Sequence, residues 1–150
     1  MEGVYDMKKY VVILVFSENF SKVLLVKRVQ KPYINCWNGI GGKIQENETE
    51  IEASVRECKE ETNIDLVNPK ILVTLIYPNE DNNINTGTNL TVVYANSKEI
   101  DVEENYEGVY EWKPIEFALD FNAKDIAGLS NLAQFIKEIL DKEGIKKIYD

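Results

Sequence analysis

The chain has 150 residues, of which 44% are hydrophobic and 29% are charged, as expected for one globular domain with a buried core. Its formal net charge of −9 argues against binding to the backbone of DNA or RNA, which requires a basic surface. The sequence contains no histidine, which excludes Ser-His-Asp and Cys-His catalytic sites and histidine-ligated zinc. Small anionic substrates remain compatible with this charge if a bound metal ion supplies positive charge locally.

Cys36 and Cys58 do not form a C-x-x-C motif. They are expected to be reduced thiols in a cytoplasmic protein. No stretch approaches the roughly 18 apolar residues of a membrane span. We therefore expect a soluble cytoplasmic protein that does not bind membranes.

The first part of the chain predicts two strands and a loop that lead to a glycine-rich segment. The near-continuous β-branched run at residues 10–16 is typical of a strand buried on both faces. A polar turn at 17–21 connects it to a second strand at 22–28, so these strands are expected to form a hairpin. Residues 29–36 predict a loop, and residues 37–42 (WNGIGG) lead into a helix.

The central helix is predicted over residues 49–62, where Thr49 and Glu52 have the spacing of a capping box. At about 100° per residue, the face expected to pack on the core carries Ile51, Val55, Cys58 and Thr62. The opposite face carries Glu57, Glu60 and Glu61. Like charges at this spacing destabilise a helix, and a bound divalent cation would remove that cost. A solvated acidic helix face is the alternative interpretation.

The second half of the chain predicts three more strands and a terminal helix. The strands are expected at 70–77, 88–96 and 109–113, separated by an Asn-rich loop at 78–87 and an acidic loop at 97–108. A short helical turn at 115–119 precedes a helix at 129–142, whose buried stripe contains Leu132, Ile136, Ile139 and Leu140. This order predicts a single α/β domain with a mixed sheet covered on both faces.

The segment Gly42–Ile64 closely resembles the Nudix box, G-x5-E-x7-R-E-U-x-E-E-x-G-U, where U is a bulky aliphatic residue. The matching positions are Gly42, Glu48, Arg56, Glu57, Glu60, Glu61 and Ile64. Cys58 stands at the first aliphatic position, and Asn63 replaces the final glycine, at which asparagine tolerates a left-handed helix cap. The resemblance implies the α/β/α sandwich of Nudix hydrolases as one domain over residues 1–150, with the box at 42–64.

Nudix hydrolases use a divalent cation to cleave a nucleoside diphosphate linked to another moiety. The resemblance therefore implies Mg²⁺, or Mn²⁺, as the cofactor. The implied ligands are the carboxylates of Glu57, Glu60 and Glu61, the carbonyl of Gly41, and Glu107 from the acidic loop. Glu103 and Glu104 share that loop, and the alternative interpretation of Glu107 is a solvated loop acid.

The catalytic roles implied by the resemblance fall on three residues of the box. Glu57 is the implied base that accepts a proton from the attacking water, although other members of the family use a loop carboxylate. Glu48 and Arg56 are expected to hold the loop and to orient the metal ligands.

Residues 37–45 resemble the corresponding run of MutT-like hydrolases of oxidised purine nucleoside triphosphates. The resemblance implies Asn38 as a reader of the purine base, because an amide both donates and accepts hydrogen bonds. Lys43 and Asp125 are further expected substrate contacts. The alternatives are a turn asparagine for Asn38 and an acid at a helix N-terminus for Asp125.

These observations predict Mg²⁺-dependent hydrolysis of a purine nucleoside triphosphate, oxidised or unmodified, to a nucleoside monophosphate and pyrophosphate. The alternatives are a Nudix pyrophosphatase for ADP-ribose, a nucleotide sugar or a dinucleoside polyphosphate, and a Nudix-fold binding module without activity. The intact carboxylate set argues against the binding module. The expected partner is a small nucleotide, with no nucleic-acid polymer or membrane, and the protein is expected to be a monomer or a homodimer.

Overall fold

The computed structural model describes residues 7–31, 33–78, 87–120, 125–127 and 129–145. The predicted loop at 78–87 therefore lies mostly outside the described residues. In the described part of the chain, no helix is long and apolar enough to cross a membrane.

Strand β1 (Lys8–Ser17) lies in the middle of the sheet and supplies buried side chains to both of its faces. Leu14 and Phe16 point into one core, while Ile13 and Val15 point into the other. A strand whose two faces are both apolar must be covered on both sides. The prediction from the β-branched run is therefore confirmed.

Seven strands among the described residues form one mixed sheet around β1. The strands that pair directly with β1 are β2 (Lys22–Arg28) and β4 (Ile40–Lys43), both antiparallel, and β6 (Thr88–Ser97), parallel. The remaining strands are β5 (Val67–Tyr77), which pairs with β6, and β3 (Trp37–Asn38) and β7 (Gly108–Pro114), which pair with β2.

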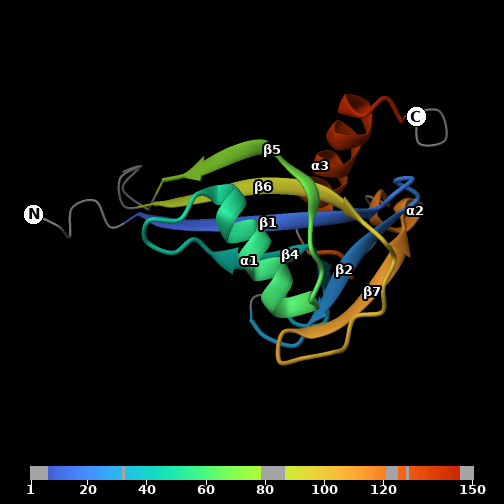
Figure 1. The fold of residues 1–150 in the computed structure, drawn as a ribbon, viewed down its shortest axis with the longest axis horizontal. Helices are drawn as coiled ribbons and strands as arrows, with labels where there is room; N and C mark the ends of the chain where they lie inside the picture. Colours follow the sequence, from blue (N-terminus) through green and yellow to red (C-terminus); the bar gives the residue numbers. More distant parts are fainter. Residues whose placement is uncertain (1–6, 32, 79–86, 121–124, 128, 146–150) are drawn as a thin grey trace, which may run out of the picture.

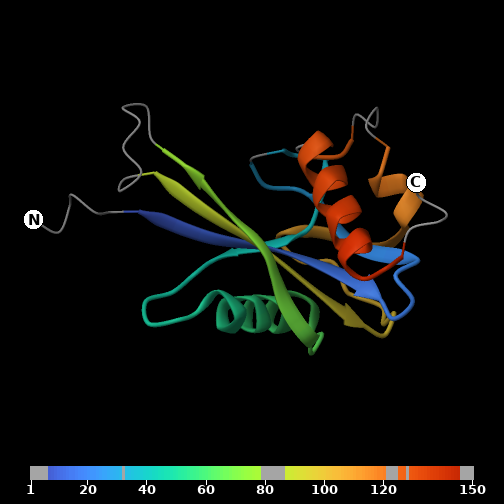
Figure 2. The same ribbon diagram turned by 90° about the horizontal axis from the view of Figure 1, so that it is seen from above.

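The helices lie on opposite faces of this sheet (Figures 1 and 2). Helix α1 (Glu50–Thr62) covers one face. Helices α2 (Ile115–Ala118) and α3 (Leu129–Lys142) cover the other, and the predicted apolar stripe of α3 is fully buried there. The predicted α/β/α sandwich with a mixed sheet is therefore confirmed.

The ends of α1 agree with the sequence prediction. Thr49 and Glu52 form both bonds of the capping box, at 2.9 and 3.1 Å, and Asn63 takes the left-handed conformation with φ of 62°. The N–H of Asn63 donates to the carbonyl of Lys59 at 3.0 Å and ends the helix. The asparagine in place of the usual glycine therefore fills the capping role expected for it.

The orientation of α1 differs from the prediction. Val55 was expected in the core but is 41% exposed, whereas Ala53 and Ser54 are buried. The helix is rotated so that Glu57 and Glu61 lie at the edge of its buried face, half-buried, rather than on the far side. Periodicity alone missed this rotation because it does not take account of the adjacent strand, where glycine leaves room for a carboxylate.

Two short strands, β3 and β4, were also missed. The segment that contains them is rich in glycine, which is depleted in strands, so it was predicted only as a lead-in to the helix. Four consecutive pairs between β4 and β1 nevertheless place this segment in the sheet, from Ile40 opposite Ile13 to Lys43 opposite Tyr10. Strand β5 also begins at Val67, earlier than predicted.

A polar contact joins the end of α3 to the sheet. Tyr94 on β6 donates a hydrogen bond to the carboxylate of Glu143 at 2.9 Å, and Lys70 on β5 donates to the same group at 3.1 Å. These bonds lower the pKa of Glu143. The ionised carboxylate is thus the form that the folded protein favours.

Replacement of Tyr94 by phenylalanine (Tyr94→Phe) is expected to destabilise the protein by about 1.5 kcal/mol at neutral pH, since this hydrogen bond has a charged acceptor. Because folding lowers the pKa of Glu143, its contribution is present above the unfolded pKa and is lost as pH falls through the folded value. Urea unfolding should therefore show the difference from wild type narrowing as the pH falls from neutral to about 3. A difference that does not change with pH would contradict this account.

Candidate active site

Arg56 on α1 connects the helix to the loop that precedes it. Its Nε and Nη2 donate to the two carboxylate oxygens of Glu48 at 2.6 and 2.9 Å, and Nη2 also donates to the carbonyl of Lys43 at 3.0 Å. Its Nη1 donates to Glu57 at 2.8 Å and to Glu60 at 3.1 Å. A bidentate pair of this kind fixes both position and orientation. Arg56 therefore fixes the loop and two of the acidic side chains in one arrangement.

The pKa values of the two carboxyl groups beside Arg56, Glu48 and Glu57, are shifted in opposite directions. The hydrogen bond from Arg56 lowers the pKa of Glu48. The carboxylates of Glu48 and Glu57 raise the pKa of Arg56 in turn. Burial raises the pKa of Glu57, and the nearby charges of Glu60 and Glu107 raise it further, against the opposing effect of Arg56. Glu57 is thus a carboxylate with a greater affinity for protons than an exposed glutamate.

Gly42 is the point at which Glu57 lies against the sheet. A Cβ atom at Gly42 would overlap the carboxylate of Glu57, whereas a Cβ at Gly41 would meet only the carbonyl of Val11 at 3.5 Å. The first contact is impossible and the second is an ordinary van der Waals distance. The Glu57 carboxylate can therefore occupy this position only if residue 42 has no side chain.

Glu61 and Glu107 come from distant parts of the chain and meet beside Glu57. Burial raises the pKa of Glu61 to about 8, with further contributions from the charges of Glu107 and Glu57 and from a side-chain hydrogen bond with Glu107. The Oε2 atom of Glu61 is buried and has no hydrogen-bond partner among the described residues. Three acidic groups therefore lie close together, and the nearby charges of Arg56 and Arg28 offset their mutual repulsion only in part.

Only some of the predicted metal ligands lie close to one another. Glu57, Glu61 and Glu107 interact with one another, whereas the side chain of Glu60 is 57% exposed and binds Arg56. Within the described residues, no three acidic or thiol groups already surround a common point as a metal shell would. A complete shell would therefore require some of these side chains to rotate.

The donor chemistry nevertheless fits a divalent cation. Mg²⁺ prefers oxygen ligands and retains several waters, so it needs few protein ligands. A bound cation would give the Oε2 atom of Glu61 a partner and would reduce the repulsion between Glu61 and Glu107. Glu103 and Glu104, the other acids of the same loop, are exposed. Of the three loop acids, Glu107 is the one that meets Glu61.

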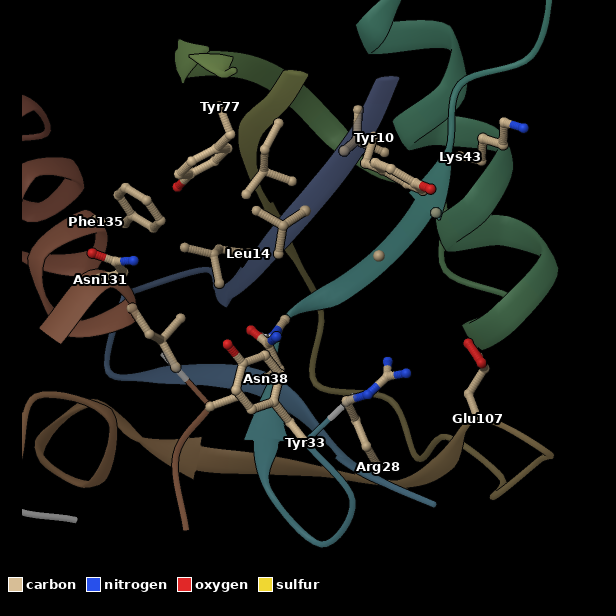
Figure 3. Close-up of a pocket in the computed structure, with 18 residues that line it drawn as sticks. Tyr10, Leu14, Arg28, Tyr33, Asn38, Lys43, Tyr77, Glu107, Asn131 and Phe135 are labelled. Carbon is tan, nitrogen blue, oxygen red and sulfur yellow. Dashed lines mark hydrogen bonds between the residues drawn. The ribbon is translucent and has the colours of Figure 1, made fainter. Parts of the chain in front are cut away.

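A cavity of about 620 Å³ extends from Glu107 to helix α3 (Figure 3). Its acidic end contains Gly41, Gly42, Arg28 and Glu107. Its other end is apolar and aromatic, with Tyr77 from β5, Phe135 from α3, and Leu14, Leu90 and Leu132. The cavity is thus divided into a charged half and an apolar half.

The predicted substrate contacts have different positions relative to this cavity. Asn38 lines it from strand β3 and not from a turn, and its Oδ1 accepts a hydrogen bond from the N–H of Gly39 at 2.8 Å. Lys43 lines the edge, with its ammonium group directed away from Asn38 (Figure 3). The exposed Asp125 is not part of the cavity wall, although its carbonyl accepts from the N–H of Trp37 at 2.7 Å.

Sequence reasoning did not predict most residues of the cavity wall, among them Arg28, Tyr33, Asn131 and Phe135. Asn131 and Phe135 are four positions apart on α3 and lie beside its buried stripe, a spacing that places them on one helix face. Arg28 ends a buried strand directly before a polar loop. These local signals are visible in the sequence, but only the fold places them at the same cavity.

A family model for the NUDIX domain matches residues 7–132 of this chain. The chain belongs to the Nudix family. The family resemblance predicted from the box is therefore confirmed, and the match extends well beyond the box on both sides.

Relatives of this Nudix protein differ in the activities for which they are named. Dihydroneopterin triphosphate diphosphatase of Escherichia coli K12 is 31% identical over 66 residues, which are 44% of this chain and 43% of that enzyme. ADP-ribose pyrophosphatase of Methanocaldococcus jannaschii is 39% identical in an alignment of length 66 that covers 39% of this chain and 39% of that enzyme. Both matches span less than half of the relative's length.

The solved structure of a MutT protein from Methanosarcina mazei Go1 resembles the whole fold. It superposes with a TM-score of 0.68 at 25% identity and covers 93% of this chain and 96% of that one. The Nudix family and its fold are thus established for the chain.

The packing of Glu57 on Gly42 gives a matched pair of variants. Gly42→Ala is expected to displace the Glu57 carboxylate and to weaken Mn²⁺ binding by about tenfold or more, because the ligand geometry is lost. Gly41→Ala adds the same methyl group one residue earlier, where only a van der Waals contact is made, and should retain binding. Calorimetric titration of both variants with Mn²⁺ measures the difference. Equal binding by the two variants would contradict the role assigned to Gly42.

Proposed function

We propose that this Nudix protein hydrolyses a nucleoside polyphosphate to a nucleoside monophosphate and pyrophosphate with the help of a divalent cation. The observation that carries the proposal is the divided cavity. Its charged half is lined by Arg28 and Glu107, and Glu107 lies beside Glu57 and Glu61, whereas its apolar half is lined by aromatic side chains. A phosphate chain and a flat base attached to it require these two environments side by side.

The residues that would hold the cation are Glu57, Glu61 and Glu107, together with the carbonyl of Gly41 and, after rotation of its side chain, Glu60. When bound, Mg²⁺ or Mn²⁺ supplies neutralisation of the phosphate charge and lowers the pKa of a coordinated water. The chain is acidic overall, so this local positive charge is what allows an anionic substrate to approach.

Glu57 is the proposed acceptor of the proton from the attacking water. Its raised pKa brings it closer to neutral pH, where a general base is most effective. Arg56 holds Glu57 by a hydrogen bond of 2.8 Å and is itself fixed by Glu48. Glu107 is the alternative base, since it also reaches the charged half of the cavity. Arg28 lines the same half and provides a positive charge for the phosphates.

The apolar half is proposed to hold the base. Tyr77 and Phe135 offer aromatic surfaces, and the amides of Asn38 and Asn131 offer donors and acceptors for the edge of a ring system (Figure 3). A two-ring heterocycle, such as an oxidised or unmodified purine, uses all of these groups. We therefore favour a purine nucleoside triphosphate, and a pterin triphosphate is the nearest alternative, as the name of the E. coli relative suggests.

Two other functions are kept as alternatives. One is cleavage of ADP-ribose, which the name of the M. jannaschii relative suggests. Cleavage of a nucleotide sugar or of a dinucleoside polyphosphate belongs to the same class. The other is a binding module without activity, and the complete carboxylate set of the box argues against it. A cytoplasmic location and a monomeric or homodimeric state stay predictions.

A hydrolysis panel with product identification tests the proposal. It contains oxidised and unmodified purine triphosphates, a pterin triphosphate, ADP-ribose, a nucleotide sugar and a dinucleoside tetraphosphate, each with Mg²⁺ and with EDTA. We expect Mg²⁺-dependent release of pyrophosphate from a purine triphosphate. Glu57→Gln should reduce the rate by about 100-fold or more, because it removes the proposed base.

The possible outcomes separate the alternatives. Preference for ADP-ribose or a nucleotide sugar would retain the metal site but overturn the assignment of the apolar half to a triphosphate's base. Hydrolysis of none of these compounds, by a protein that still binds Mn²⁺ and nucleotide, would favour the binding module. An unchanged rate for Glu57→Gln would exclude Glu57 as the base.

A further inference from the structure

We propose that Asn105 is a positioning residue that fixes Glu107 against the acidic end of α1 and thereby sets the affinity of the site for its divalent cation. The inference rests on the proposed function, because it takes Glu107 to be a metal ligand. Asn105 lies outside the Nudix box, in the loop before β7.

Asn105 is the first residue of a tight turn that contains Glu107. The backbone N–H of Asn105 donates to the carbonyl of Gly108 at 3.1 Å, and the N–H of Gly108 donates back to Asn105 at 3.1 Å. The side-chain Oδ1 of Asn105 accepts from the N–H of Glu107 at 2.8 Å and from the hydroxyl of Tyr110 at 3.4 Å. An asparagine that bonds the backbone two residues ahead stabilises such a turn. The backbone of Glu107 is therefore held by the Asn105 side chain.

The other end of the same amide reaches α1. Its Nδ2 donates to the carbonyl of Glu61 at 3.0 Å. Glu61 is in the last turn of α1, where helix carbonyls have no partner within the helix. One side chain thus joins the backbones of Glu61 and Glu107. These are two of the acidic residues that lie close together at this site, and, besides burial, the charge of Glu107 helps to raise the pKa of Glu61.

The other contacts of this turn are to β2 and the loop after it. The N–H of Val29 donates to the carbonyl of Glu107 at 3.0 Å, and Nε2 of Gln30 donates to the carbonyl of Tyr106 at 3.1 Å. Gly108 has φ of 151° and lies against the carbonyl of Lys27, where no side chain fits. Loss of the Asn105 amide would therefore leave the turn attached to β2 but release its backbone from α1. The spacing between Glu107 and the helix carboxylates would then no longer be fixed.

Two variants test the two ends of the amide. Asn105→Ala removes all three hydrogen bonds of the Asn105 side chain, to Glu61, Glu107 and Tyr110. Asn105→Ser retains a short acceptor for the N–H of Glu107 but cannot reach the carbonyl of Glu61. We expect both variants to raise the Kd for Mn²⁺ by about tenfold or more in calorimetric titration without substrate, as is typical for residues that orient metal ligands. We also expect a higher Mg²⁺ concentration for half-maximal hydrolysis, with kcat at saturating Mg²⁺ changed much less.

Tyr94→Phe is the matched control, because it removes one hydrogen bond from the opposite core. It should lower stability without changing the Kd for Mn²⁺. Wild-type Mn²⁺ affinity in both Asn105 variants would overturn the proposal, as would an equal loss of affinity in Tyr94→Phe. Failure of the wild-type protein to bind Mn²⁺ would instead overturn the metal site on which the proposed function depends, so the two failures are distinguishable.

Discussion

The site depends on one guanidinium group. Arg56 uses all of its N–H donors, one on Nε and two on each Nη atom, to bind Glu48, Glu57, Glu60 and the carbonyl of Lys43. Without this charge, the acidic residues of α1 would repel one another along a single flank of the helix. Lysine has fewer donors and lacks the planar fork, so it cannot make the same set of contacts. The hydrogen bonds of Arg56 thus fix the positions of the loop and the acidic side chains of the Nudix box relative to one another.

The rotation of α1 explains why acidic residues and glycines occur together in the box. Gly42 of β4 leaves room for Glu57 against the sheet, so the Glu57 carboxylate lies beside the strand instead of facing bulk water. Partial burial raises the pKa values of Glu57 and Glu61. A bound hard cation would relieve the electrostatic repulsion between these carboxylates. Packing, electrostatics and the proposed chemistry are therefore linked through Gly42.

The sequence was sufficient for features determined by neighbours along the chain. The capping box at Thr49, the left-handed cap at Asn63 and the buried stripe of α3 were all predicted from local spacing and are all present. Features determined by distant contacts were not predictable in this way. Val55 is exposed because the sheet, and not the helix period, decides which face is buried. Asn131 and Phe135 meet Asn38 at one cavity only because α3 packs on the face of the sheet opposite α1.

The central claim is that Glu57, Glu61 and Glu107 bind one divalent cation at the charged end of the cavity. The most direct test is a crystal structure with Mn²⁺, located by its anomalous scattering. The account predicts a peak coordinated by Glu57 and Glu61, with Glu107 in or next to the coordination shell. A peak elsewhere, such as beside the exposed acids Glu99 and Asp101, would contradict it.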